Sequence, residues 1–467
     1  MAVARADAAG AAAVVAEGVA DAASTRRRLL PMTGAMIEPE PIRKTLLGSG
    51  LRLVTERLPG LRSAAVGCWV GTGSRDEPDA LAGASHFLEH LLFKGTERRS
   101  AVDIAEAIES VGGDMNAFTA QELTAYYVRV PDSSLTLAVD ILSDILWSPA
   151  FREDDIECER QVILEEIRMR DDTPDDLVHD LFSNAMFPHH PIGREVIGSP
   201  ETVKAMSRAD IAGFHSTHYH PSNVVIAVAG NIDHDEVAEL VDRALAGAEG
   251  QRPPRAPHDG TPAPQPVAVL ERPTEQAHIV LGMRSLRRDD PDRYALTVLN
   301  QVFGAGMSSR LFQDVREQRG LAYSVFSYRS AFQETGTLAI YAGTSPERVP
   351  ELLDVLDAQL DRLVADGGIT SRELAAAKGH LTGSLSLSLE SSSSRMHRLG
   401  RSELTLNEVP TIDELVAEIE KVTGDDIARV IDRVVAAPER SVAAVGPVTG
   451  DMLAAAVRAP LAPAPGA

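Results

Sequence analysis

The chain has 467 residues and a formal net charge of −23, from 45 basic and 68 acidic side chains. This acidity argues against nucleic-acid binding, which needs clustered Lys and Arg, and no run approaches the ~18 unbroken apolar residues of a membrane-spanning helix. The two cysteines, Cys68 and Cys158, are too few for a disulfide framework or a Cys-rich zinc module. We therefore expect a globular protein of roughly two to four domains, with no nucleic acid and no membrane among its partners.

The N-terminal segment 1–40 is rich in Ala and carries a short basic cluster at 26–28. A secretory signal places its charges before an apolar core. Here the charges follow an Ala stretch that acidic residues interrupt, which favours a disordered extension, with a weak targeting segment as the alternative. Basic residues are mostly Arg, with only five Lys, a bias typical of GC-rich coding. Since nothing demands an oxidising compartment, we expect a cytoplasmic bacterial protein.

The region 41–249 alternates strands and helices and is expected to form the first domain. Short segments rich in Val and Tyr, bounded by Gly, Pro or Asn, predict strands at 50–56, 63–71, 112–120, 123–130 and 223–230. Apolar residues at helical spacing predict helices at 85–94, 101–111, 134–147, 154–171, 174–186, 208–219 and 233–245.

The segment 250–265 contains five Pro and few large apolar side chains, which predicts an interdomain linker. Behind it, the region 266–460 repeats the order of elements and is expected to form the second domain. Its predicted strands are 266–273, 277–284, 321–329 and 336–344, and its predicted helices are 294–318, 349–365 and one that begins at 371.

The two halves also resemble each other in sequence. In the alignment Glu159 falls opposite Ala377, and Glu166 falls opposite Ser384. We interpret the chain as a duplicated α/β domain whose second copy lacks carboxylates that the first retains; a chance match between two alternating halves is the alternative. The aligned segments are 124–146 with 337–360 and 151–167 with 369–385.

The segment 83–96, GASHFLEHLLFKGT, contains His86, Glu89 and His90 in the order H-x-x-E-H. Helical residues four apart lie one turn apart on one face, so the two imidazoles can bind one metal ion. Glu89 lies three residues after His86 on the same face, where its carboxylate can reach a water molecule at that metal. A solvated His/Glu face is the alternative interpretation.

A third metal ligand is expected to be a carboxylate or a His from elsewhere in the chain. The segment 157–170, ECERQVILEEIRMR, supplies candidates. Glu159 and Glu166 are two helical turns apart and share a face. Glu165 lies roughly 100° round the helix from Glu166, so we assign it to the solvated face.

These segments together resemble the inverzincin zinc peptidases, the family of mitochondrial processing peptidase, pitrilysin and insulin-degrading enzyme. AGASHFLEHLLFKGT is similar to the family signature. The separation in sequence between His90 and Glu166, the glutamate that follows E-R-x-V-I-x-x, also matches the family's spacing. Shorter matches extend the resemblance over most of 40–450: GSRDEP (73–78), GHLTGSLSLSLE (379–390) and GDDIARV (424–430).

The resemblance implies one Zn²⁺ per chain, held by His86, His90 and Glu166. Glu159 matches the family's second glutamate, which does not bind the metal and instead steers a ligating His. Glu89 would act as general base, taking a proton from water and passing it to the leaving amine. On this basis we expect a zinc metalloendopeptidase that hydrolyses extended peptides.

Two further matches concern the peptide substrate. The segment 112–127 resembles the family's substrate-binding edge strand, with Asn116 and Ala117 at the contacting positions; an extended peptide would pair with it through its backbone. GMSSRLFQDVREQRGLAYSV (306–325) resembles the family's Arg/Tyr motif, which places Arg316 and Tyr323 on a substrate carbonyl and on the oxyanion.

In this family four domains enclose the active site, supplied by one long chain or by two half-length chains. We therefore expect two α+β domains per chain, each a mixed, mainly antiparallel sheet with packed helices. Both motifs occur in this half-length chain, which predicts a homodimer whose sites combine Glu89 of one chain with Tyr323 of the other. The alternatives are a non-catalytic structural or partner subunit and a processing peptidase for targeting sequences.

Overall fold

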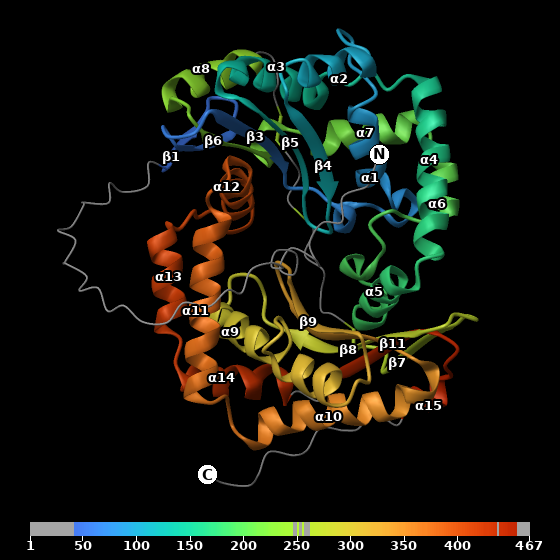
Figure 1. Ribbon diagram of the computed structural model, residues 1–467. Helices are drawn as coiled ribbons and strands as arrows, with labels where there is room; N and C mark the ends of the chain where they lie inside the picture. The colour runs from blue at the N-terminus through green and yellow to red at the C-terminus, as the bar shows by residue number, and fades with distance from the viewer. Residues whose placement is uncertain (1–41, 246–249, 252–254, 256–261, 437–438, 455–467) are drawn as a thin grey trace, which may run out of the picture.

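The structure, a computed structural model, describes residues 42–245, 250–251, 255, 262–436 and 439–454. Two β-sheets lie one above the other, each with its own set of helices (Figure 1). This arrangement confirms the expected α+β fold. The predicted disordered extension 1–40 and most of the predicted linker 250–265 lie outside the described residues. In the described part of the chain, no helix is both long enough and apolar enough to cross a membrane.

The first sheet has six strands in the spatial order β1-β2-β6-β3-β5-β4. β2 and β6 pair in parallel, and the other neighbours pair antiparallel. β3 and β6 are buried along almost their whole length, because helices cover both faces of the sheet. The strands are β1 (Ile42–Leu46), β2 (Arg52–Arg57), β3 (Ser63–Val70), β4 (Asp114–Thr119), β5 (Thr124–Pro131) and β6 (Val224–Gly230).

Helices of the same half cover the outer face of this sheet. Phe87 of α1 and Ile141 and Ile145 of α3 enter its core beside Val66 and Val128 of the strands. The helices of this half are α1 (Ala84–Leu92), α2 (Ala101–Glu109), α3 (Leu135–Trp147), α4 (Glu153–Asp171), α5 (Pro174–Met186), α6 (Pro200–Ala205), α7 (Arg208–His218) and α8 (His234–Ala244).

The second sheet has the order β7-β11-β8-β10-β9, with β7 and β11 parallel and the other pairs antiparallel. Its strands are β7 (Val267–Glu271), β8 (Ala277–Ser285), β9 (Ser324–Ala331), β10 (Gly336–Thr344) and β11 (Arg440–Gly446). The helices of the second half of the chain are α9 (Arg293–Phe303), the π-helix η6 (Phe312–Gln318), α10 (Val349–Ala365), α11 (Ser371–Ser388), α12 (Ser392–Leu406), α13 (Ile412–Lys421), α14 (Gly424–Val430), the π-helix η8 (Ile431–Val435) and α15 (Gly450–Ala454).

The inner face of each sheet is covered by one helix from the other half (Figure 1). α5, which follows α4 in the first half, packs on β8 and β11, where Phe182 and Met186 lie against Val280 and Tyr341. α12, which follows α11 in the second half, packs on β3 and β6 of the first sheet. The two halves therefore exchange equivalent helices.

The α12 contact is close because glycine lies on both sides of it. A Cβ on Gly67 of β3 would lie 2.3 Å from Met396 Sδ, and a Cβ on Gly400 of α12 would lie 2.0 Å from Trp69 Nε1. Glu56 of β2 is fully buried and forms ion pairs with two arginines of α12, Arg395 and Arg398. Steric fit and buried charge together fix α12 on the first sheet.

The two sheets share one topology, since β2-β6-β3-β5-β4 and β7-β11-β8-β10-β9 have the same order and the same parallel pair. β9 thus takes the place in the second half that the edge strand β4 takes in the first. The aligned sequence segments also coincide in structure, because β5 and α3 match β10 and α10, while α4 matches α11.

Several predicted elements differ from the structure. The single helix expected over 294–318 is wrong: α9 ends at Phe303, and a turn containing Gly304 and Gly306 separates it from η6. The sequence reasoning also missed the strands β1 and β11, the short helix α6 and the helices that follow α11, which are α12, α13, α14 and α15. β1 is a largely exposed edge strand and β11 is buried throughout, so neither shows a clear alternation of apolar and polar residues.

Candidate active site

The helix that carries H-x-x-E-H begins in a backbone turn that favours glycine. Gly83 has φ 94°, and a Cβ there would lie 2.7 Å from the Ile197 carbonyl oxygen. The buried carboxylate of Glu77 accepts hydrogen bonds from the N–H groups of Gly83 at 2.8 Å and Ser85 at 2.7 Å. Two of the N–H groups that a helix start leaves unpaired are thereby satisfied, which fixes where α1 begins.

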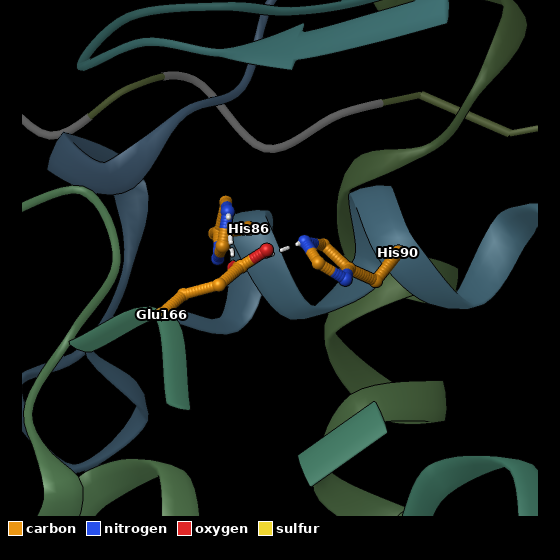
Figure 2. Close-up of side chains that lie close together, drawn as sticks. All are labelled: His86, His90 and Glu166. Atoms are coloured by element: carbon orange, nitrogen blue, oxygen red, sulfur yellow. Dashed lines mark ion pairs between the residues drawn. The ribbon is translucent and has the colours of Figure 1, made fainter. Parts of the chain in front are cut away.

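His86, His90 and Glu166 come together between α1 and α4, and their ligand atoms all lie within 4.8 Å of one another. Glu166 Oε2 is 3.8 Å from His86 Nε2 and 3.5 Å from His90 Nε2. Figure 2 shows the Glu166 carboxylate extending from α4 toward both imidazoles. The i, i+4 spacing on α1 puts both rings on one face, with centroids 4.7 Å apart.

The chemistry of this donor set fits a divalent metal such as zinc. Glu166 Oε2 is buried and has no hydrogen-bond donor among the described residues, and an unpaired buried carboxylate oxygen is unfavourable without a cation. Burial, helped by the neighbouring His90, lowers the pKa of His86 to about 3, which keeps its imidazole neutral, as a ligand must be. Two His and one carboxylate are a donor set that catalytic zinc sites use.

Glu159 lies two helical turns before Glu166 on α4 and is buried. It accepts a hydrogen bond from His90 Nδ1 at 3.0 Å and forms an ion pair with Lys94 Nζ at 2.5 Å. Burial acts to lower the pKa of His90, but Glu159 and the nearby carboxylates outweigh it and raise that pKa. The contact leaves Nε2 of His90 to face Glu166. Glu165, by contrast, is exposed and pairs with Arg168.

Glu89 lies on the same helix and is held by a residue that sequence reasoning missed. Thr119 Oγ1 donates a hydrogen bond of 2.6 Å to Glu89 Oε2. Burial raises the pKa of Glu89, and the bond from Thr119 and the charge of His90 act in the opposite direction. Strand alternation could have found Thr119, since it stands two residues after Ala117 and shares its face. Lys94 was missed in the same way, although it lies four residues after His90.

Asn116 and Ala117 lie on β4, which is the edge strand of the first sheet. β5 is its strand partner on one side, and the other side carries no strand among the described residues. Asn116 is exposed, and its Oδ1 accepts a hydrogen bond from the Ala117 N–H at 2.8 Å. The α1 helix packs beside this strand.

Arg316 and Tyr323 meet each other but not the metal group of their own chain. The Arg316 guanidinium stacks over the Tyr323 ring at 4.5 Å and over the Phe312 ring at 4.8 Å. Tyr323 is 78% exposed. Within the described residues, no hydrogen bond, ion pair or ring contact joins either side chain to His86 or its neighbours. The motif precedes β9 in the second half, away from α1 (Figure 1).

Comparisons with known proteins give a family match for each half of the chain. A family model described as insulinase (peptidase family M16) matches residues 52–200, and one described as peptidase M16 inactive domain matches residues 205–381. The chain is 46% identical to an uncharacterized zinc protease of Streptomyces coelicolor, over 91% of this chain and 95% of that protein. It is 49% identical to an uncharacterized zinc protease of Mycobacterium tuberculosis, over 82% of this chain and 89% of that protein.

Solved structures share the fold. The crystal structure of a protease from Helicobacter pylori superposes with a TM-score of 0.82 at 24% identity, covering 88% of this chain and all of that one. A structure titled peptidase M16 inactive domain, from Pseudomonas fluorescens, also reaches 0.82, at 20% identity, with 88% and 99% coverage.

Proposed function

The chain belongs to peptidase family M16, the insulinase family, and we propose that it is a zinc-dependent endopeptidase that hydrolyses extended peptides with Glu89 as general base. The observation that carries this proposal is the convergence of His86, His90 and Glu166 within 4.8 Å beside Glu89. The curated relatives that carry the name zinc protease support the same activity class.

We assign His86, His90 and Glu166 as the residues that hold one Zn²⁺ per chain. Bound there, zinc would supply a Lewis acid that polarises a substrate carbonyl and eases the deprotonation of water. Glu159 fixes the ring of His90 through Nδ1, so that Nε2 is presented to the metal.

Glu89 moves the proton. One of its carboxylate oxygens takes a proton from the attacking water as the oxygen of that water bonds to the scissile carbonyl carbon. When the C–N bond breaks, Glu89 returns the proton to the leaving amine nitrogen, so the carboxylate is regenerated. Burial raises the pKa of Glu89, which makes it a stronger base than an exposed carboxylate.

The open edge of β4 is the proposed docking site for the peptide. An extended peptide adds to a sheet edge through its backbone, which gives affinity with little demand on sequence. In the structure the Ala117 N–H donates its hydrogen bond to Asn116 Oδ1, and a peptide carbonyl would replace that oxygen as the acceptor. Arg316 and Tyr323 would act on the substrate from another surface, with the Tyr hydroxyl donating to the oxyanion.

We further propose that the protein is a homodimer whose active sites are completed in trans. Tyr323 is exposed and has no contact with the metal group of its own chain, so it is free to serve a second chain. A two-fold dimer would then contain two complete sites, each with Glu89 from one chain and Tyr323 from the other.

The test is to measure bound zinc and the hydrolysis of a quenched peptide in wild-type and variant proteins. Wild type should bind zinc and hydrolyse the peptide. Glu89→Gln should keep zinc and lose nearly all hydrolysis, whereas His90→Ala or Glu166→Gln should lose both. A folded wild-type protein with neither property would instead be a non-catalytic subunit, and a zinc-free Glu89→Gln protein would contradict the assignment of Glu89 as a non-ligand.

The two remaining glutamates of α4 provide a matched comparison. Glu159→Gln should retain zinc largely and slow turnover by about 10- to 100-fold, the usual effect of removing a residue that orients a metal ligand. Glu165→Gln is the control on the same helix, and it should change neither zinc content nor turnover. Loss of zinc in Glu165→Gln but not in Glu166→Gln would overturn the ligand assignment.

A further inference from the structure

Thr119 is the last residue of β4 and faces the helix that carries the proposed base. Residues alternate across a strand, so Met115, Ala117 and Thr119 share one face, and Ala117 and Met115 pack in the core that contains α1. This alternation directs the Thr119 hydroxyl at Glu89, where it donates a hydrogen bond of 2.6 Å to Oε2. The contact joins the proposed peptide-binding strand to the proposed base.

We propose that Thr119 is a positioning residue that fixes the orientation of the Glu89 carboxylate; this inference rests on the proposed function. The terminal torsion of a Glu side chain has broad, roughly two-fold minima, so an unrestrained carboxylate samples many orientations. The Thr119 hydroxyl engages Oε2, and this leaves Oε1 to exchange the proton with water and amine. A short bond from a hydroxyl to a carboxylate is also among the stronger hydrogen bonds in proteins.

The strand that carries Thr119 is itself held in place by both halves of the chain. Glu122, in the turn between β4 and β5, is buried and forms ion pairs with Arg75 of the first half and Arg288 of the second. Its Oε1 also accepts a hydrogen bond from the Gln333 N–H at 3.2 Å. A peptide paired with β4 and a base bonded to Thr119 would therefore share one rigid frame, which aligns the scissile carbonyl with the base.

The experiment compares Thr119→Val, which keeps the shape and the preference for strands but loses the hydroxyl, with Thr119→Ser, which keeps the hydroxyl. Thr124→Val is the matched control, because Thr124 pairs with Thr119 across the strands and donates instead to the Thr72 carbonyl at 2.9 Å. Kinetics on a quenched peptide, zinc content and thermal unfolding are measured for each variant.

Thr119→Val should lower kcat by about 10- to 100-fold, the loss expected when a hydrogen bond to a charged group is removed, while KM and zinc content stay close to wild type. Thr119→Ser should restore most of the kcat, and Thr124→Val should lower stability without a comparable fall in kcat. Equal kcat values for the Val and Ser variants, or a rise in KM alone, would overturn the inference.

Crystal structures of wild type and Thr119→Val test the contact independently of turnover. The Glu89 carboxylate should leave its wild-type orientation in Thr119→Val, and an unchanged orientation would overturn the inference. Thr119→Ala serves the same purpose if the Val variant does not fold. A zinc-loaded wild-type protein without peptidase activity would contradict the proposed function and leave this structural result intact.

Discussion

The exchange of α12 predicts that Gly400→Ala is strongly destabilising, although alanine normally favours a helix. The added methyl group would lie 2.0 Å from Trp69 Nε1, 2.2 Å from Cδ1 and 2.4 Å from Cε2. The indole ring is fully buried and packs edge-on against Phe118 and His397, so it has no room to move aside. Overpacking of this kind costs about 1–3 kcal/mol, and we expect the upper part of that range.

Gly379→Ala is the matched control, because Gly379 lies in the neighbouring helix α11 and a Cβ there meets no atom within 4 Å. That change should stabilise the protein by about 0.5–1 kcal/mol through helix propensity and the loss of chain entropy in the unfolded state. Urea unfolding followed by Trp fluorescence measures both variants. If Gly400→Ala were as stable as Gly379→Ala, the close packing of α12 on the first sheet would be refuted.

Chains carrying Glu89→Gln and chains carrying Tyr323→Phe should be inactive separately but should regain about a quarter of wild-type turnover when refolded together, because half the dimers are then mixed and each mixed dimer has one intact site. No recovery would mean that Tyr323 serves its own chain. The Arg310 guanidinium donates two hydrogen bonds to the two carboxylate oxygens of Glu373, at 2.7 and 3.0 Å, and this lowers the pKa of Glu373 to about 2. Since this folded-state pKa lies below the ordinary value of 4.5, the stabilisation is complete above that pH and is lost as the pH falls toward 2. Glu373→Gln should therefore cost about 1 kcal/mol at pH 7 after allowance for solvent screening, with a Tm difference from wild type that shrinks in acid; Glu414→Gln, in a similar exposed capping box, should change Tm less.

The local elements of the fold could be predicted from sequence because their signals are local. The strands β3, β5 and β6 are apolar runs bounded by turn residues, and α3 carries an apolar stripe at helical spacing. The placement of α12 on the first sheet could not be predicted in this way. It depends on the fit of Gly400 against Trp69, two residues more than 300 positions apart, and no periodicity in either segment reports such a contact.

The candidate site shows the same division between local and tertiary information. Helical spacing alone puts His86 and His90 on one face and separates Glu165 from Glu166. The meeting of α1 with α4 came only from the family resemblance, because nothing in the two helices specifies their crossing. Thr119 was overlooked for a similar reason, since the approach of β4 to α1 is a tertiary contact and alternation gives only the face.

The exchanged helices have a consequence for how the protein is made. The last strand of the first sheet, β6, ends at Gly230, but the helix that covers its inner face begins at Ser392. Chains fold from the N-terminus during synthesis, so this face stays uncovered until the ribosome has added most of the second half. α5 is synthesised before the second sheet, on which it packs, so its apolar face is also uncovered until that sheet forms.

We therefore expect that neither half completes its fold alone, because cutting the chain between them would separate each sheet from one of its covering helices. In the alignment of the two halves, Ala377 and Ser384 stand opposite Glu159 and Glu166, yet the second half supplies α12, Arg288 and the surface that receives α5. Gene duplication is often followed by loss of the redundant copy. Because each half supplies a helix that covers the other's sheet, we expect that loss of either half would leave an apolar sheet face exposed to water.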